Sequence, residues 1–235
     1  MSIKAVLFDL DGTLLPMDIK SFLKAYFGGM SKWLAPYGYS PEKFIATVWA
    51  GTEAMITNDG SRTNEEAFWD TFSGAFGEKA RADEPKLDAY YREQFDKVSE
   101  ACGYTPKAKE AVELAKKNGR RVVLATNPIF PSIATEKRMK WAGLDKSDFE
   151  FFTTYENSCY TKPNLKYYEV ILEKLGVSAE DCLMVGNDVT EDMVAKKLGM
   201  KVFLLTDCII NKNGEDISVY PHGDFDALIA YLENL

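Results

Sequence analysis

Two carboxylates near the start of the chain have a spacing that suits a cation site. Asp9 and Asp11 follow an apolar run over residues 5–8 and are followed at once by Gly12 and Thr13. The run predicts a buried strand, and Gly12 allows a sharp turn at its end. Two acids this close repel each other unless a proton or a cation lies between them, and Mg²⁺ prefers oxygen ligands. The alternative is an ordinary acidic turn, since Asp-Gly is a common turn pair.

Three later segments place further polar groups at or just after the ends of predicted strands. Thr126, with Asn127, ends one strand, where a hydroxyl and backbone amides suit an anion such as a phosphoryl oxygen; a turn residue is the alternative. Lys162 precedes Pro163, which fits the first turn of a helix. A cation there opposes the helix dipole and suggests a nearby anion, although a solvated surface lysine explains the local sequence as well.

The third segment, residues 186–192, reads Gly-Asn-Asp-Val-Thr-Glu-Asp after a buried strand. Asp188 and Asp192 are four positions apart across a strand-to-helix turn, so their carboxylates can converge on one ion. Ordinary helix capping would explain Asp188 equally well in isolation.

The elements that must position these groups alternate along most of the chain. We predict strands over 5–8, 121–126, 149–153, 182–185 and 201–205, and helices over 106–118, 131–141, 163–175, 191–198 and 225–232. This alternation predicts an α/β fold with a doubly wound parallel sheet. Because the carboxyl ends of parallel strands meet at one edge, the polar groups are expected to lie together there.

Residues 16–102 interrupt the alternation. They show helix-like periodicity with many aromatic residues and no convincing buried strand, which predicts an inserted unit of roughly four helices. We expect the aromatic residues to form mainly the core of that unit. Lys20, Thr52 and Arg62 are polar candidates for facing the site, but their spacing selects none of them.

Composition limits the classes of partner. The chain has 235 residues, of which 46% are hydrophobic and 27% charged, as in an ordinary globular protein. Its net charge of −8 and pI near 4.9 argue against nucleic acid or an anionic membrane as a partner. Four cysteines without metal-ligand spacing, no signal-peptide pattern and no membrane-length apolar run lead us to expect a cytoplasmic protein, as a monomer or homodimer.

Taken together, the motifs resemble those of the haloacid dehalogenase (HAD) superfamily. D-L-D-G-T at 9–13 resembles its first motif, Thr126 the second, Lys162 the third and G-N-D-V-T-E-D at 186–192 the fourth. The insertion resembles the family's helical cap. The resemblance implies a core domain of residues 1–15 and 103–235 and an α-helical cap domain of residues 16–102.

The resemblance also implies roles for these residues. Asp9 would be the nucleophile that forms an aspartyl-phosphate, and Asp11 the general acid and then the base. Thr126, Asn127 and Lys162 would hold the phosphoryl group. Mg²⁺ would be bound by Asp9, by the backbone carbonyl of Asp11 and by Asp188. The family often has Gly-Asp where Asn187 follows Gly186 here, so Asn187 and Asp192 are alternative ligands or neighbours of the metal shell.

Within the superfamily, Asp11 argues against dehalogenation, because dehalogenases lack this second acid. The expected activity is hydrolysis of a small phosphorylated metabolite. A phosphosugar mutase is the alternative, although residues 16–102 contain none of the cap histidines that commonly assist mutases, and His222, the only histidine, is expected in a surface loop. A phosphonate hydrolase using a cap lysine is possible but unsupported. Outside enzymes, a receiver-like domain or a catalytically silent phosphate-binding protein remains.

Overall fold

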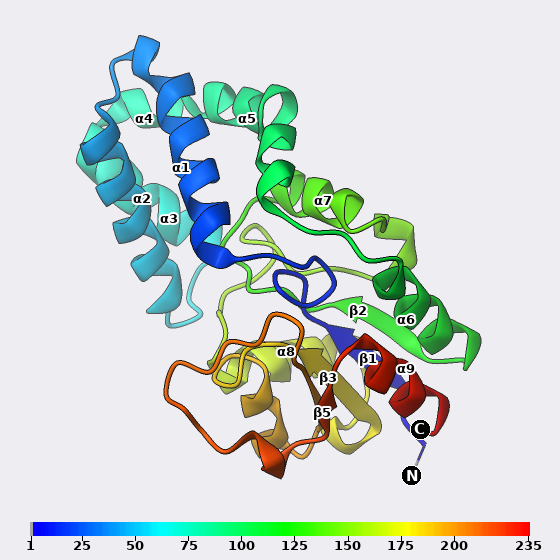
Figure 1. Ribbon diagram of the computed structural model, residues 1–235. Helices are drawn as coiled ribbons and strands as arrows, with labels where there is room; N and C mark the ends of the chain where they lie inside the picture. The colour runs from blue at the N-terminus through cyan, green and yellow to red at the C-terminus, as the bar shows by residue number, and fades with distance from the viewer. Residues whose placement is uncertain (1) are drawn as a thin grey trace.

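A five-stranded parallel sheet forms the lower part of the molecule in Figure 1. The computed structural model describes residues 2–235. The strands are β1 (Ala5–Phe8), β2 (Arg121–Leu124), β3 (Cys182–Gly186), β4 (Lys201–Leu205) and β5 (His222–Gly223). They lie in the order β2-β1-β3-β4-β5, so β1 is central and is hydrogen-bonded to β2 on one side and β3 on the other.

Both faces of the sheet are buried, as the continuous apolar strands predict. Alternate residues of β1 point to opposite faces: Val6 and Phe8 belong to one apolar cluster, and Ala5 and Leu7 to the other. The first cluster includes α6 (Pro106–Lys117), α7 (Ser132–Trp141) and α9 (Phe225–Glu233), and the second includes α8 (Leu165–Leu175). These layers confirm the doubly wound α/β fold.

The helical unit lies above the sheet in Figure 1 and is connected to it by two neighbouring segments. It consists of α1 (Ile19–Leu34), α2 (Pro41–Ile56), α3 (Asn64–Phe76), α4 (Glu78–Ala82) and α5 (Glu84–Glu93). This is one helix more than expected, because Gly77, with φ of 70°, ends α3 and lets a short helix start in a new direction. At its base Met17 forms a β-bridge with Cys102, and the N–H of Gly103 donates to the carbonyl of Pro16 at 2.7 Å.

Six 3₁₀ segments complete the elements of residues 2–235: Ala35–Tyr37, Phe95–Ala101, Lys146–Asp148, Ala179–Asp181, Met193–Leu198 and Ile217–Val219.

Four predicted elements differ from the structure. The helix expected over 191–198 is the 3₁₀ segment Met193–Leu198, and Asp188 caps the turn before it by accepting the amides of Thr190 and Glu191. Strand β2 ends at Leu124 rather than at 126, where the chain turns into the loop before α7.

The segment over 149–153 runs along the outer edge of β2 but is not a regular strand. Hydrogen bonds join the Glu150 N–H to the Val122 carbonyl and the Thr153 N–H to the Leu124 carbonyl, at 2.8 and 3.1 Å. Only one bridge, between Leu124 and Phe152, has ladder geometry. The prediction of a strand there is wrong because the edge pairing is interrupted after a single residue pair.

Helix α8 begins at Leu165, two residues later than predicted. The side chain of Asn164 accepts a hydrogen bond from the N–H of Lys166 and caps the helix, so Pro163 lies outside it. A cis peptide bond joins Lys162 to Pro163. Lys162 therefore still precedes the amino end of α8, but it is separated from the first helical residue by Pro163 and the cap Asn164.

No helix among residues 2–235 is long and apolar enough to cross a membrane.

Candidate active site

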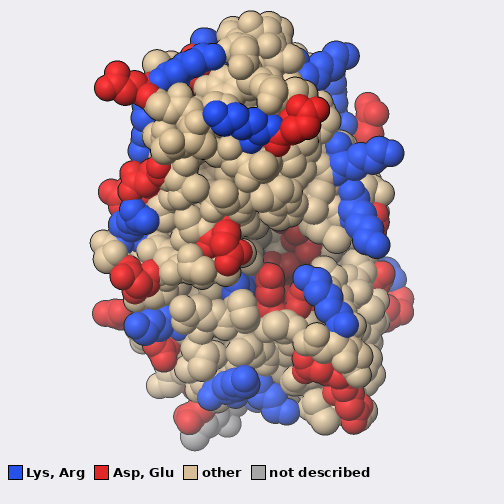
Figure 2. All heavy atoms as spheres, turned by 90° about the vertical axis from the view of Figure 1, so that its left-hand side faces the viewer, with Lys and Arg blue, Asp and Glu red and all other residues tan. Residues whose placement is uncertain are grey.

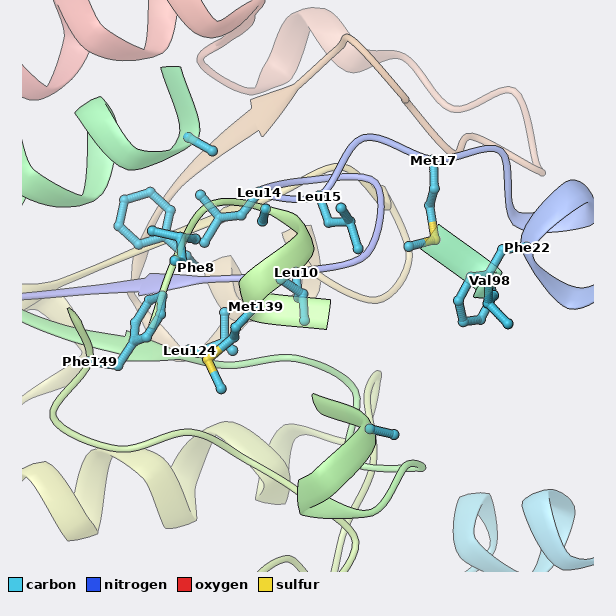
Figure 3. Packing of buried hydrophobic residues seen from close by; sticks show 14 of the residues in the cluster. Phe8, Leu10, Leu14, Leu15, Met17, Phe22, Val98, Leu124, Met139 and Phe149 are labelled. Carbon is cyan, nitrogen blue, oxygen red and sulfur yellow. The ribbon is translucent and has the colours of Figure 1, made fainter. Parts of the chain in front are cut away.

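The end of β1 places Asp9 between its two neighbouring strands. Its N–H donates to the carbonyl of Val185 in β3 at 2.9 Å, and the side chain is 9% exposed. Gly12 has φ of 82°, and a Cβ there would lie 2.3 Å from Nδ2 of Asn187, so only glycine suits the turn. Figure 3 shows Leu10, Leu14 and Leu15 of this loop among buried apolar side chains. The loop that holds Asp9 is thus anchored by packing.

Lys162 connects the first and fourth motifs. Its Nζ lies 2.9 Å from Oδ1 of Asp9 and 2.6 Å from Oδ1 of Asp192, and the side chain is 1% exposed. Burial by itself would lower the pKa of Lys162, but the carboxylates of Asp192 and Asp9 raise it well above its ordinary value. Lys162 is therefore a buried ammonium held between two acids, and these acids explain its position.

The loop after β3 is fixed by Asp192. Its Oδ2 accepts the N–H of Asp188 at 2.9 Å, and a Cβ on Gly186 would lie 2.1 Å from the same oxygen. Oδ1 of Asp188 accepts the amides of Thr190 and Glu191 at 2.8 and 3.0 Å. Burial raises the pKa of Asp192, and the charge of Lys162 opposes this effect. Both oxygens of Asp192 are engaged, so it orients Lys162 and Asp188.

Asn187 is also engaged at both ends of its amide. Its Nδ2 donates to the carbonyl of Cys208 at 2.6 Å, and its Oδ1 lies 3.0 Å from the Thr13 hydroxyl. The same hydroxyl lies 3.1 Å from Oδ2 of Asp9. Asn187 and Thr13 therefore join the loops that follow β1 and β3 and orient the Asp9 carboxylate.

Asp11 is held from another direction, by α7. Its Oδ2 accepts a hydrogen bond from Nη1 of Arg138, whose side chain is fully buried and lies 4.3 Å from the centroid of the Phe130 ring. Oδ1 of Asp11 is buried and has no partner among residues 2–235. Burial raises the pKa of Asp11, Arg138 lowers it, and the charge of Asp9 raises it, with a net shift upward. One oxygen is thus fixed by Arg138, and the other has no hydrogen-bond partner among the described residues.

Thr126 and Asn127 follow β2. The Thr126 carbonyl accepts hydrogen bonds from the hydroxyls of Thr153 and Tyr167 at 2.6 and 2.9 Å, which fixes the backbone and leaves the Thr126 side chain on the cavity. Asn127 donates from Nδ2 to Glu191 at 2.9 Å and accepts the N–H of Lys162 at 3.3 Å. Burial raises the pKa of Glu191 to about 7. The Asn127 side chain is therefore structural, and its backbone N–H is the group available to a ligand.

These residues surround one cavity of about 450 Å³ between the sheet and the helical unit. Its floor is defined here as the predicted site residues Asp9, Asp11, Thr126, Asn127, Asn187, Asp188 and Asp192, with Lys162 beneath them. Its roof is defined as the apolar side chains of the helical unit that line it, among them Leu23, Phe27, Trp49 and Phe68. Figure 2 shows the molecule hollowed between its upper and lower halves, with acidic side chains inside the hollow.

Sequence reasoning missed three residues of this site. Thr13 lies inside the first motif and Glu191 inside the fourth, so their positions carried a signal that was not used. Arg138 carried none, because a lysine- or arginine-containing helix normally places such residues in solvent. Of the polar candidates in the helical unit, Thr52 lines the cavity, whereas Arg62 pairs with Asp70 at the surface.

The donor set suits Mg²⁺. Among residues 2–235, no three side chains of His, Cys, Asp or Glu are grouped closely enough to hold an ion. The set expected from the motifs needs only two carboxylates, Asp9 and Asp188, with the backbone carbonyl of Asp11. All are oxygen donors, and two amides fix the orientation of Asp188. Mg²⁺ commonly uses one or two carboxylates and keeps several water ligands, so these residues fit it.

A family model agrees with the geometry. The model of the haloacid dehalogenase-like hydrolases matches residues 3–199. The chain belongs to this family. No curated protein matches the HAD-like hydrolase described here.

Solved structures share the fold of this HAD-like hydrolase across nearly the whole chain. A HAD phosphatase from Thermococcus onnurineus is 22% identical with a TM-score of 0.61, and 98% of each chain is covered. A 2-haloacid dehalogenase from Pseudomonas syringae pv. tomato is 19% identical with a TM-score of 0.65, covering 99% of each. A HAD-hydrolase from Bacillus subtilis bound to magnesium is 18% identical with a TM-score of 0.57, also covering 99% of each. At these identities the likeness shows the fold.

Proposed function

We propose that this HAD-like hydrolase is a Mg²⁺-dependent phosphatase that hydrolyses a small phosphomonoester through an aspartyl-phosphate on Asp9. The proposal includes a core domain of residues 1–15 and 103–235, a cap domain of residues 16–102, and a cytoplasmic monomer or homodimer. The observation that carries it is the buried Lys162 ammonium, 2.9 Å from Asp9 and 2.6 Å from Asp192 at the floor of the cavity. Phosphoryl transfer depends on positioning and charge neutralisation, and this cation supplies both.

In the proposed reaction, an oxygen of Asp9 attacks phosphorus and the alcohol leaves. Lys162 and Thr13 hold the two oxygens of Asp9, so the carboxylate is oriented before the substrate arrives. The Thr126 hydroxyl and the Asn127 N–H would hold the phosphoryl oxygens together with the Lys162 ammonium, which lies beneath the floor and offsets the charge on Asp9. Asp9, the Asp11 carbonyl and Asp188 would hold Mg²⁺, which would neutralise phosphate charge.

In this proposal Asp11 would donate and then accept the proton. Arg138 fixes its Oδ2, while the buried Oδ1 is without a partner among the described residues. That oxygen would protonate the leaving alkoxide and then accept a proton from the water that attacks the aspartyl-phosphate. Because a halide leaving group needs no proton, this second acid supports phosphatase over dehalogenase activity.

The roof does not favour the two related reactions. No lysine of residues 16–102 is among the described residues lining the cavity, which counts against a Schiff base for phosphonate cleavage. The same residues contain no histidine to assist a mutase. The intact set of polar groups at the floor counts against a silent phosphate-binding protein.

The test is phosphate release from p-nitrophenyl phosphate with Mg²⁺ and with a chelator. We expect turnover only with the metal and a fall of ~10⁴-fold in Asp9→Asn, since the nucleophile is lost. In Asp11→Asn, acid-quenched protein should carry one added phosphoryl group at Asp9, because hydrolysis of the intermediate lacks its base. Asp70→Asn, at an exposed surface carboxylate, is the matched control. Turnover that persists in Asp9→Asn would reject the proposal.

A further inference from the structure

The roof of the cavity differs in kind from its floor. Ile19, Leu23 and Phe27 are four residues apart on α1, so they form one stripe along the helix, and all three line the cavity. Trp49 of α2 lines it as well and packs on Phe27, with ring centroids 5.5 Å apart. The wall that faces Asp9 is therefore aromatic and aliphatic.

Part of this wall is exposed. Trp49 is 48% exposed and Ile19 is 42% exposed. Large apolar side chains that are open to solvent and contiguous mark a surface on which a ligand or partner is bound. Here they open into an internal cavity that ends at the proposed nucleophile, so a small molecule suits them better than a protein surface.

The helical unit brings few free polar groups to the cavity. The hydroxyls of Tyr26 and Tyr91, which line it, bond to each other at 2.7 Å, and among the described residues Nε1 of Trp69 is a buried donor without a partner. The hydroxyl of Thr52 donates to the Val48 carbonyl of its own helix at 2.9 Å. The carboxylate of Asp88 accepts from Arg92 at 3.3 Å and adds a negative charge to the wall. Of the described residues that line the cavity, Lys212 alone is a cation, and it belongs to an exposed loop on the core side. A carboxylate or second phosphate placed under the roof would meet no cation from the helical unit.

We infer that the phosphomonoester cleaved at this site has an uncharged, largely apolar leaving group, an alkyl chain or an aromatic ring, which lies against Leu23, Phe27 and Trp49. The inference rests on the proposed phosphatase function and names its substrate class. Burial of each methylene against such a wall is worth about 0.8 kcal/mol, or roughly a fourfold change in affinity. Polyhydroxylated and carboxylated phosphate esters gain nothing comparable, because the helical unit offers their several polar groups one unpartnered donor, Nε1 of Trp69, and no cation.

The experiment compares primary phosphate esters with similar leaving-group chemistry. Ethyl, butyl, hexyl and 3-phenylpropyl phosphate are measured beside glycerol 3-phosphate and phosphoglycolate, all with Mg²⁺. We expect kcat/KM to rise about fourfold per added methylene, and hexyl phosphate to exceed glycerol 3-phosphate by ~30-fold or more. A flat series, or a preference for glycerol 3-phosphate or phosphoglycolate, overturns the inference while leaving the phosphatase proposal standing.

Substitution of Trp49 tests whether the roof causes the preference for apolar leaving groups. Trp49→Ala should lower kcat/KM for 3-phenylpropyl phosphate about tenfold, mainly through KM, and change that for ethyl phosphate less than twofold. Tyr104→Ala is the control, since Tyr104 is an aromatic residue, 64% exposed, outside the cavity. An equal loss on both substrates in Trp49→Ala overturns the assignment of the roof.

A binding measurement separates the two proposals. If no ester is hydrolysed with Mg²⁺, the phosphatase proposal fails, and titration of ethylphosphonate and hexylphosphonate into the protein by calorimetry still tests the roof. Tighter binding of hexylphosphonate, lost in Trp49→Ala, supports an apolar occupant. Equal or weaker binding of hexylphosphonate rejects it.

Discussion

The floor and the roof of the cavity differ in the chemistry of their side chains. The floor brings Asp9, Asp188 and Asp192 together and stabilises them with one buried lysine and backbone amides. The roof contains almost no charge and is built from aromatic rings that pack on one another. Electrostatic preorganisation suits a reaction common to many substrates, whereas apolar contacts discriminate by shape and size. In the proposed function, the floor would therefore carry out the reaction and the roof would select the substrate.

Replacing Lys162, the cation beneath the floor, should have the largest effect on the rate of hydrolysis. Lys162→Met leaves Asp9 and Asp192 buried without their counter-ion, so we expect kcat to fall ~10³-fold. The measurement is steady-state hydrolysis of ethyl phosphate with Mg²⁺. Lys166→Met, at an exposed lysine on α8, is the control. A loss confined to KM would show that the lysine only binds substrate.

Disrupting the helical unit should cost stability. Phe72 is fully buried on α3 and packs edge-on against Phe44, with ring centroids 6.0 Å apart. Phe72→Ala should lower the free energy of unfolding by about 3–5 kcal/mol, because it leaves a cavity among the rings. Hydrogen exchange should show lost protection in α2 and α3 and retained protection in β1 and β3. Equal loss in the strands would mean that the two units unfold as one.

The contact between Asp11 and α7 should have a smaller effect. Arg138→Met leaves the Asp11 carboxylate without its counter-ion, which should lower the free energy of unfolding by about 3 kcal/mol. Chemical denaturation measures it. In an Asp11→Asn background the same substitution should cost about half as much or less, since the charge is absent. Additive effects would show that Arg138 stabilises α7 by packing alone.

The smallest effect on the free energy of unfolding is expected at Asp83, a buried acid of the helical unit. Burial raises the pKa of Asp83, but hydrogen bonds from Lys86 and Tyr39 lower it below its ordinary value. A lowered folded-state pKa contributes stability above the unfolded pKa of about 4 and loses it as the pH falls. Asp83→Asn should therefore destabilise the protein by about 1 kcal/mol at pH 7 and by less at pH 3, in urea unfolding. An equal cost at both values would exclude the ionic contribution.

The arrangement of the floor could be predicted because parallel strands end at one edge. Asp9, Thr126 and Asp188 each follow a strand, and the structure places them around one cavity, as their order in the chain indicates. Arg138 could not be found this way. It is separated from Asp11 by 127 positions and lies in a helix whose pattern predicts exposure.

The roof was beyond prediction for a different reason. Phe22, Leu23, Tyr26 and Phe27 of α1 all line the cavity, but Phe22 and Tyr26 are buried whereas Leu23 and Phe27 are half-buried. Helical periodicity alone cannot predict this difference. The expectation that the aromatic residues form mainly a core is incomplete, because several of them, including Phe27 and Trp49, also line the cavity. Trp49 of α2 packs on Phe27 of α1 and is itself 48% exposed, a tertiary arrangement that the sequence pattern does not contain.

The point where the chain leaves the sheet for the helical unit is also the point where it returns. Met17 and Cys102 are bridged there, and Gly103 bonds to Pro16 at 2.7 Å. A segment whose ends meet can be lengthened, shortened or exchanged without altering the order of the strands. A different set of helices could therefore be inserted between residues 17 and 102. Such a chimera should keep the residues at the floor of the cavity in place and should change which substrate the cavity binds.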